Sequence, residues 1–112
     1  MTAASRFEYT GDAGLQEKIL AALHRVIDPE MSLDIVELGL VYAVDAKPGV
    51  VAVRATMTSA ACPVAEFIVD EIVVEVKRAL GDDVAVDVDL VWEPPWAPER
   101  MSDRAREIMG WD

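Results

Sequence analysis

The spacing of apolar residues changes abruptly near residue 81, and this change constrains the fold more than any other feature. Over residues 63–80 the apolar residues recur at helical spacing and form a wide stripe (Ile68, Val69, Ile72, Val73, Val76, Ala79 and Leu80). Pro63 suits the first position of this helix and Gly81 its end. Over residues 84–92 apolar residues instead alternate with Asp87 and Asp89, the period of a half-buried strand. A helix leading directly into a strand indicates a mixed α/β domain.

The first half of the chain predicts the remaining elements. Helical spacing over residues 14–27 should end there, because Asp28 precedes Pro29 and is disfavoured in the α region. Two β-like runs, 36–44 and 50–57, flank turn residues and predict a hairpin. A last helix over residues 102–109 has Ser102 as its N-cap and Gly110 at its end. The predicted order is α-β-β-α-β-α: a two-layer sandwich with a small three-stranded mixed sheet covered by helices.

Length and composition favour one small soluble domain. The chain has 112 residues, 53% of them hydrophobic. Residues 1–12 lack periodicity and are expected to form a flexible arm, leaving residues 13–112 as a single domain with a Pro/Trp-rich C-terminal segment. A net charge of −11 disfavours binding to nucleic acid and to anionic membranes. No signal peptide and no run of roughly 20 apolar residues is evident, so we expect a cytoplasmic protein.

Cys62 is the chain's one cysteine and its most distinctive chemical group. If a helix begins at Pro63, Cys62 occupies the N-cap, where free N–H groups and the helix dipole favour a thiolate. A thiolate is both a nucleophile and a soft metal ligand. The alternative is a small buried hydrophobe, and the sequence leaves both open.

An acidic loop and two threonines close to Cys62 in sequence offer further candidates. Asp28, Glu30, Asp34 and Glu37 fall within ten residues, and capping of turn N–H groups is the favoured role for Asp28. The hydroxyls of Thr56 and Thr58 either line a site or pair across the hairpin. His24 is expected to be solvated, so no base for a thiol enzyme is evident and we expect a protein that is not an enzyme.

Phe67 and Val74 interrupt the charged side of the helix over residues 63–80. Either the C-terminal helix folds back over them or they contact another chain. Trp92, Trp96 and Trp111 supply apolar area in the tail, which favours the packed-tail interpretation over an interface.

Three motifs together resemble a known family. The first is DPE at residues 28–30, followed by DIVELGLVY at 34–42. The second is MTSAACP at 57–63, and the third is WEPPW at 92–96 followed by RMS at 100–102. Their order and spacing resemble the SufT/PaaD family of iron–sulfur cluster assembly proteins. Glu37 stands where that family usually has Asp. PaaD relatives carry a Cys-rich C-terminal extension that is absent here, which favours the SufT-like branch.

The resemblance implies an accessory role in assembling iron–sulfur clusters or transferring them to client proteins. It maps the family's reactive cysteine onto Cys62 and its acidic residues onto Asp28 and Glu30, with Thr58 nearby. One thiolate cannot hold a cluster in the usual four-thiolate manner. We therefore expect Cys62 to be a transient, shared ligand to iron or a cluster, completed by a homodimer, a small thiol or a client, with no tightly bound cofactor. The expected partners are assembly proteins and apo clients. The alternative is a metal-free adaptor that recruits clients.

Overall fold

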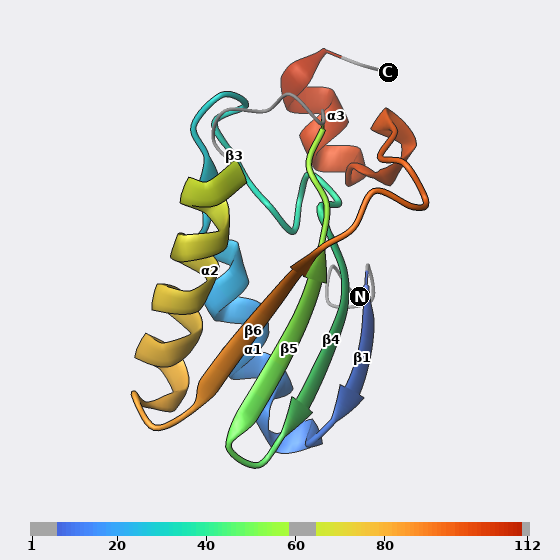
Figure 1. Ribbon diagram of the computed structural model, residues 1–112. Coiled ribbons are helices and arrows are strands. Elements are labelled where there is room, and N and C mark those ends of the chain that lie inside the picture. Colours follow the sequence, from blue (N-terminus) through green and yellow to red (C-terminus); the bar gives the residue numbers. More distant parts are fainter. Residues whose placement is uncertain (1–6, 59–64, 111–112) are drawn as a thin grey trace.

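The computed structural model describes residues 7–58 and 65–110, and within them a mixed sheet is flanked by helices (Figure 1). Its strands are β1 (Glu8–Gly11), β4 (Val41–Lys47), β5 (Val50–Ala55) and β6 (Ala85–Leu90), in the order β1-β4-β5-β6. β4 and β5 are antiparallel, whereas β1 runs parallel to β4 and β6 parallel to β5. A separate antiparallel ribbon consists of β2 (Ile27–Asp28) and β3 (Leu33–Asp34).

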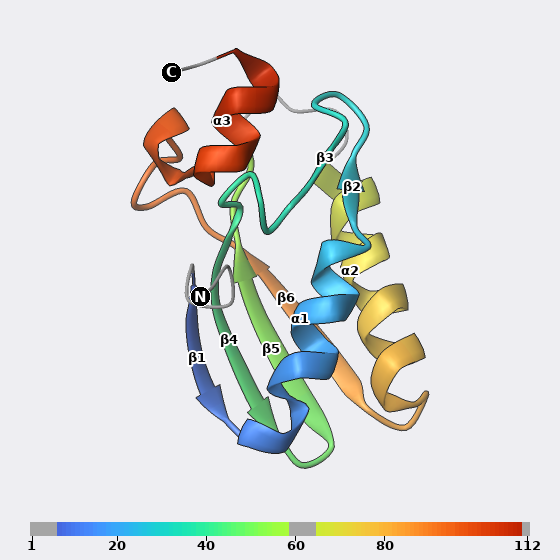
Figure 2. The same ribbon diagram turned by 180° about the vertical axis from the view of Figure 1, so that it is seen from behind.

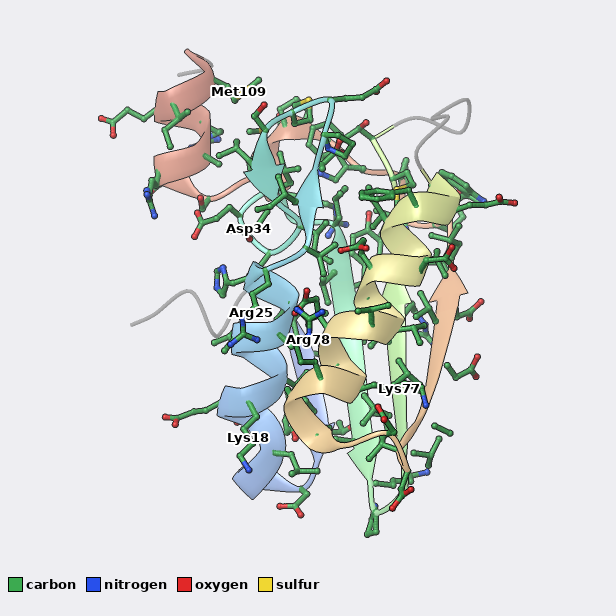
Figure 3. All side chains as sticks on the ribbon, turned by 90° about the vertical axis from the view of Figure 1, so that its left-hand side faces the viewer. Lys18, Arg25, Asp34, Lys77, Arg78 and Met109 are labelled. Carbon is green, nitrogen blue, oxygen red and sulfur yellow. The ribbon has the colours of Figure 1, made fainter. Side chains whose placement is uncertain are left out.

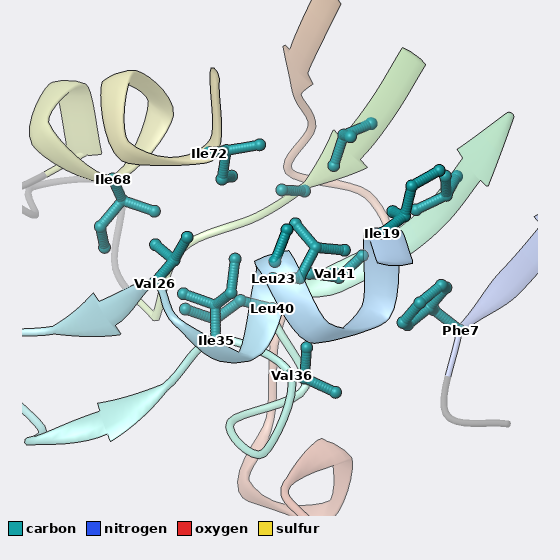
Figure 4. Close-up of a cluster of buried hydrophobic side chains, with 14 of the residues drawn as sticks. Phe7, Ile19, Leu23, Val26, Ile35, Val36, Leu40, Val41, Ile68 and Ile72 are labelled. Atoms are coloured by element: carbon teal, nitrogen blue, oxygen red, sulfur yellow. The ribbon is translucent and has the colours of Figure 1, made fainter. Parts of the chain in front are cut away.

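The helices α1 (Gln16–His24) and α2 (Ala65–Leu80) both cover the same face of the sheet, and no helix lies over the other face of its described strands (Figures 1 and 2). Alternation places Val51, Val53 and Ala55 of β5 in the core, while Ala52 and Arg54 point outward. Ile19 and Leu23 of α1 and Ile68 and Ile72 of α2 are all fully buried members of this core (Figure 4). Full burial of such side chains contributes about 1.5–3 kcal/mol each.

The C-terminal segment contains a short helix, α3 (Asp103–Met109), which confirms the prediction made for residues 102–109. The Ser102 hydroxyl accepts a hydrogen bond from the Ala105 N–H at 2.9 Å and so caps the helix. Gly110 ends the helix with a left-handed backbone, at φ 78°. The strand predicted after Gly81 is also confirmed: Ala85, Asp87 and Asp89 are exposed, and Val86, Val88 and Leu90 are half-buried.

The N-terminal prediction is wrong for residues 8–11. They form β1 rather than part of a flexible arm, so the sheet has four strands instead of three and the order begins with a strand. Four residues are too few to show a period. What holds β1 is its pairing with β4, 35 residues further along, together with the burial of Phe7 just before it.

The first helix and the first hairpin strand are both shorter than predicted. α1 ends at His24, the Arg25 N–H bonds back to Ala22, and Ile27 pairs with Asp34 in the ribbon with 46% of its surface exposed. β4 begins at Val41 rather than at residue 36. Residues 35–40 instead form a turn in which the Leu40 N–H bonds to Ile35. In both places local turn hydrogen bonds override the apolar periodicity.

Candidate functional site

Asp28 ends β2, next to the turn of the β2–β3 ribbon, and is buried, with 1% of its surface exposed. Its Oδ1 accepts the Glu30 N–H at 2.9 Å, and its backbone carbonyl accepts N–H groups from Met31 and Ser32. These bonds hold the turn between the strands, which confirms the capping role predicted for Asp28. Glu30 lies at the tip of the ribbon and is exposed.

Thr58 follows β5 and is half-buried, whereas Thr56 is fully buried. The Thr56 N–H bonds to the Leu40 carbonyl at 2.8 Å, but its hydroxyl has no hydrogen-bond partner among the described residues. Within the described part of the chain, therefore, neither threonine hydroxyl makes the cross-hairpin bond that the sequence analysis gave as one alternative. Cys62, predicted to be the N-cap of a helix that begins at Pro63, lies outside the described residues, as does Pro63.

The described residues that flank Cys62 in sequence lie at the same end of the molecule as the ribbon. β5 runs toward this end, α2 begins there, and the β2–β3 ribbon stands beside the first turn of α2 (Figures 1 and 2). The fold thus brings Asp28, Glu30 and Thr58 to one end, from segments almost 30 residues apart.

His24, Asp34 and Glu37 form a cluster of metal-ligand types that the sequence analysis did not predict. Their donor atoms lie within 4.8 Å of one another among the described residues. His24 Nδ1 is 3.2 Å from Asp34 Oδ1, so the prediction that His24 is simply solvated is wrong. The same oxygen accepts the N–H groups of Val36 and Glu37, each at 2.9 Å. Asp34 points toward the end of α1 (Figure 3), and these bonds explain the cluster as a link between α1 and the following turn.

The turn over residues 35–40 also anchors the C-terminal segment. The Ser102 hydroxyl donates to the Glu37 carboxylate, and the Ser102 N–H bonds to the Glu37 carbonyl at 2.8 Å. Trp96 Nε1 donates to the Leu38 carbonyl at 2.7 Å. Gly39, at φ 76°, lies so close to the Arg100 backbone that a Cβ there would sit 2.2 Å from the Arg100 oxygen.

Tyr42 adds a further contact between the same two motifs. Its hydroxyl donates to the Pro94 carbonyl at 2.8 Å, and the Arg100 guanidinium stacks 4.5 Å from its ring centroid. The motifs at 34–42 and 92–102 therefore pack against each other. These contacts give the residues that make them a structural role.

Phe67 and Val74 on α2 are exposed, at 49% and 43%. The described tail, through Gly110, does not cover them, so the packed-tail interpretation is wrong. Among the described residues, no helix is both long and apolar enough to cross a membrane.

The chain belongs to the family of iron–sulfur cluster assembly proteins, which it matches over residues 16–88. It is 45% identical over 103 residues to the Fe-S protein maturation auxiliary factor YitW of Bacillus subtilis, covering 88% of this chain and 97% of that protein. It is 42% identical over 89 residues to the Fe-S protein maturation auxiliary factor SufT of Staphylococcus aureus, covering 76% and 97%. The crystal structure of a domain of unknown function, DUF59, from Bacillus anthracis superposes with a TM-score of 0.81 at 40% identity, over 88% of this chain and 94% of that one. The predicted SufT-like family and mixed α/β fold are both confirmed.

Proposed function

We propose that this chain is a non-enzymatic accessory factor in iron–sulfur cluster assembly or transfer, and that Cys62 is a transient ligand to the iron or cluster it handles. The observation that carries the proposal is the family match over residues 16–88, a stretch that contains the chain's one cysteine. The relatives named as Fe-S protein maturation auxiliary factors support the same role.

The ligand count sets the mechanism. Iron–sulfur clusters are usually held by four thiolates, and this chain offers one. The remaining ligands come from a second copy, a small thiol or the client. Such a shared site releases its cargo when a client offers a better ligand set, which suits transfer better than storage. Glu30, exposed at the ribbon tip, is the carboxylate best placed to contact the cargo or client, while Asp28 keeps the turn in shape.

Anaerobic reconstitution with ferrous iron and sulfide tests the role of Cys62. The visible spectrum and the iron and sulfide bound per chain are measured for the wild type, for Cys62→Ala and for Ser59→Ala, a control in the same segment. We expect the wild type and Ser59→Ala to acquire the same chromophore and Cys62→Ala to lose it. Uptake of an equal chromophore by Cys62→Ala would rule out the ligand role.

The exposed side chains of Phe67 and Val74 favour a second function, a metal-free adaptor that recruits clients. An adaptor should tolerate Cys62→Ala and fail when these two residues become polar. Complementation of a strain lacking the chain, read as the activity of an iron–sulfur enzyme, compares Cys62→Ala with Phe67→Ser/Val74→Ser. Loss of activity in Cys62→Ala alone contradicts the adaptor, and loss in the double variant alone contradicts the ligand role.

A further inference from the structure

The sheet face that lacks a helix cover presents two cross-strand rows of side chains. Glu8, Ala43, Arg54 and Asp89 occupy one row, since these positions are paired in register from β1 to β6. Thr10, Asp45, Ala52 and Asp87 occupy the next. Each row has one alanine on a middle strand, Ala43 or Ala52, which gives a low floor at these two positions. The other middle position of each row holds a longer side chain, Arg54 or Asp45.

Two hollows follow from this pattern. One, of about 450 Å³, lies over the two rows. The other, of about 640 Å³, lies between the sheet and the C-terminal segment and is lined by Tyr42, Pro94 and Arg100 among others. Both are lined by Glu8, Ala43 and Arg54, so the two hollows adjoin along this row. We call them together the groove, which extends from the C-terminal segment onto the open sheet.

The charge on the groove differs from that on the helix side. Six carboxylates line it (Glu8, Asp45, Asp87, Asp89, Glu93 and Glu99), against the guanidiniums of Arg54 and Arg100. On the other side of the sheet Lys18, Arg25, Lys77 and Arg78 are carried by α1, its C-cap and α2 (Figure 3), where five carboxylates nearly balance them. The groove is therefore a locally acidic channel with room for an occupant.

Not every carboxylate in the channel is equally available. Asp45 accepts the Thr10 hydroxyl at 3.1 Å and pairs with Lys47 at 3.5 Å. Asp87 and Asp89 are exposed on β6 and make no ion pair within the described residues. Two unpaired carboxylates at adjacent outward positions of one strand are the groups best suited to receive cations from a ligand.

We propose that this groove is a docking surface for an extended, basic segment of a partner protein. An extended chain places every second side chain on one side, so alternating lysines or arginines can reach the carboxylates while the backbone lies over the alanine floor. A second copy of this chain is a poor occupant, because its net charge is −11 and the groove itself is acidic. The identification of the partner as a client or assembly protein rests on the proposed function, whereas the docking chemistry does not.

Binding of a fluorescein-labelled octapeptide of alternating lysine and alanine tests the proposal, by fluorescence anisotropy at 0.15 M salt with iron-free protein. Asp87→Asn/Asp89→Asn should raise the Kd about fivefold, the size expected for two exposed ion pairs. Asp82→Asn/Asp83→Asn, in the turn before β6, makes the same change in net charge and should raise it less than about twofold, because salt screens charges that do not touch the ligand. An octapeptide of alternating glutamate and alanine, used as the charge-reversed control, should not bind.

A filling substitution separates shape from charge. Ala52→Phe leaves the net charge unchanged, suits a strand, and should weaken lysine-peptide binding at least tenfold by occupying the floor. In ¹⁵N-labelled wild type the peptide should shift the amide signals of β5 and β6 residues in the two rows. Equal weakening by both aspartate pairs, or shifts confined to α1 and α2, would overturn the proposal. If the amide signals of residues in the two rows shift with protein concentration in the absence of peptide, the groove binds a second copy of the chain. That result would also overturn the proposal. Because no iron is present, none of these outcomes depends on cluster uptake.

Discussion

Substitution of Gly39 by alanine should destabilise the protein through the contact between the turn and the C-terminal segment. Gly39 has φ 76°, and an L-residue in that left-handed region costs about 1–2 kcal/mol. In addition, a Cβ would lie 2.2 Å from the Arg100 oxygen and 2.6 Å from its carbonyl carbon, well inside contact distance. Both opposing atoms belong to the backbone, so no rotamer change relieves the clash.

Relief requires the C-terminal segment to move away, and two neighbouring hydrogen bonds oppose that movement. Trp96 Nε1 bonds to Leu38 at 2.7 Å, and the Ser102 N–H bonds to Glu37 at 2.8 Å. Loss of each costs about 0.5–1.5 kcal/mol. Added to the backbone term, these losses predict that Gly39→Ala lowers the free energy of unfolding by about 3.5 kcal/mol.

Gly49→Ala is the matched control. Gly49 has a similar φ of 83° with nothing within 4 Å of its added Cβ, so the control carries the backbone term alone, about 1.5 kcal/mol. The entropy that Gly→Ala removes from the unfolded chain is the same in both. Urea denaturation should therefore place Gly39→Ala about 2 kcal/mol below Gly49→Ala in free energy of unfolding. Equal losses in the two variants would show that the C-terminal segment is not held against the turn.

Three further changes test other parts of the structure. Thr56→Val should raise the free energy of unfolding by about 1 kcal/mol, because the buried hydroxyl has no partner among the described residues. A lower free energy of unfolding for this variant in urea denaturation would indicate that the hydroxyl has a partner. Ser102→Ala should lower the free energy of unfolding by about 2 kcal/mol, since the α3 cap and the bond to Glu37 are both lost. A loss below about 0.5 kcal/mol would contradict these two roles of Ser102. Burial, and then the charges of two nearby aspartates, raises the pKa of Tyr9 above its usual 10.0. The stability that this shift contributes is complete below pH 10 and is lost as the pH rises through the folded-state pKa. In urea denaturation over that pH range, the free energy of unfolding of Tyr9→Phe should therefore decline less than that of the wild type. An identical decline would refute a raised pKa for Tyr9.

Local patterns predicted those elements whose stability is encoded nearby. The change from helical to alternating spacing at Gly81 located α2 and β6, and Ser102 with Gly110 located α3. β1 escaped prediction because its partner strand supplies what holds it, and a four-residue strand carries no period of its own. The end of α1 was misplaced because the hydrogen bonds of Arg25 and Val26 to the last turn compete with an apolar spacing that continues to Ile27.

The candidate site was predictable in part for the same reason. The turn role of Asp28 follows from a carboxylate two residues before an N–H that it can accept, which is a local rule. The pairing of His24 with Asp34 depends on the ribbon folding back across ten residues, and no local signal marks it. An acidic residue ten positions after a helix C-terminal histidine, with a turn between them, is the weak signal that was available.

The contacts between the motifs change what the family resemblance implies about chemistry. Residues of the 34–42 and 92–102 motifs bond to each other through Glu37, Leu38, Tyr42 and their partners, so their occurrence together is accounted for by folding. Asp28 is likewise committed to its turn. Of the residues assigned to a site from sequence, this leaves Glu30, Thr58 and Cys62 without a structural reason that the described residues supply. Stability and cluster uptake should therefore separate: Ser102→Ala should unfold at lower urea yet still acquire the wild-type chromophore when folded, whereas Cys62→Ala should lose the chromophore. If folded Ser102→Ala is both less stable and unable to acquire the wild-type chromophore, the C-terminal segment contributes to the site.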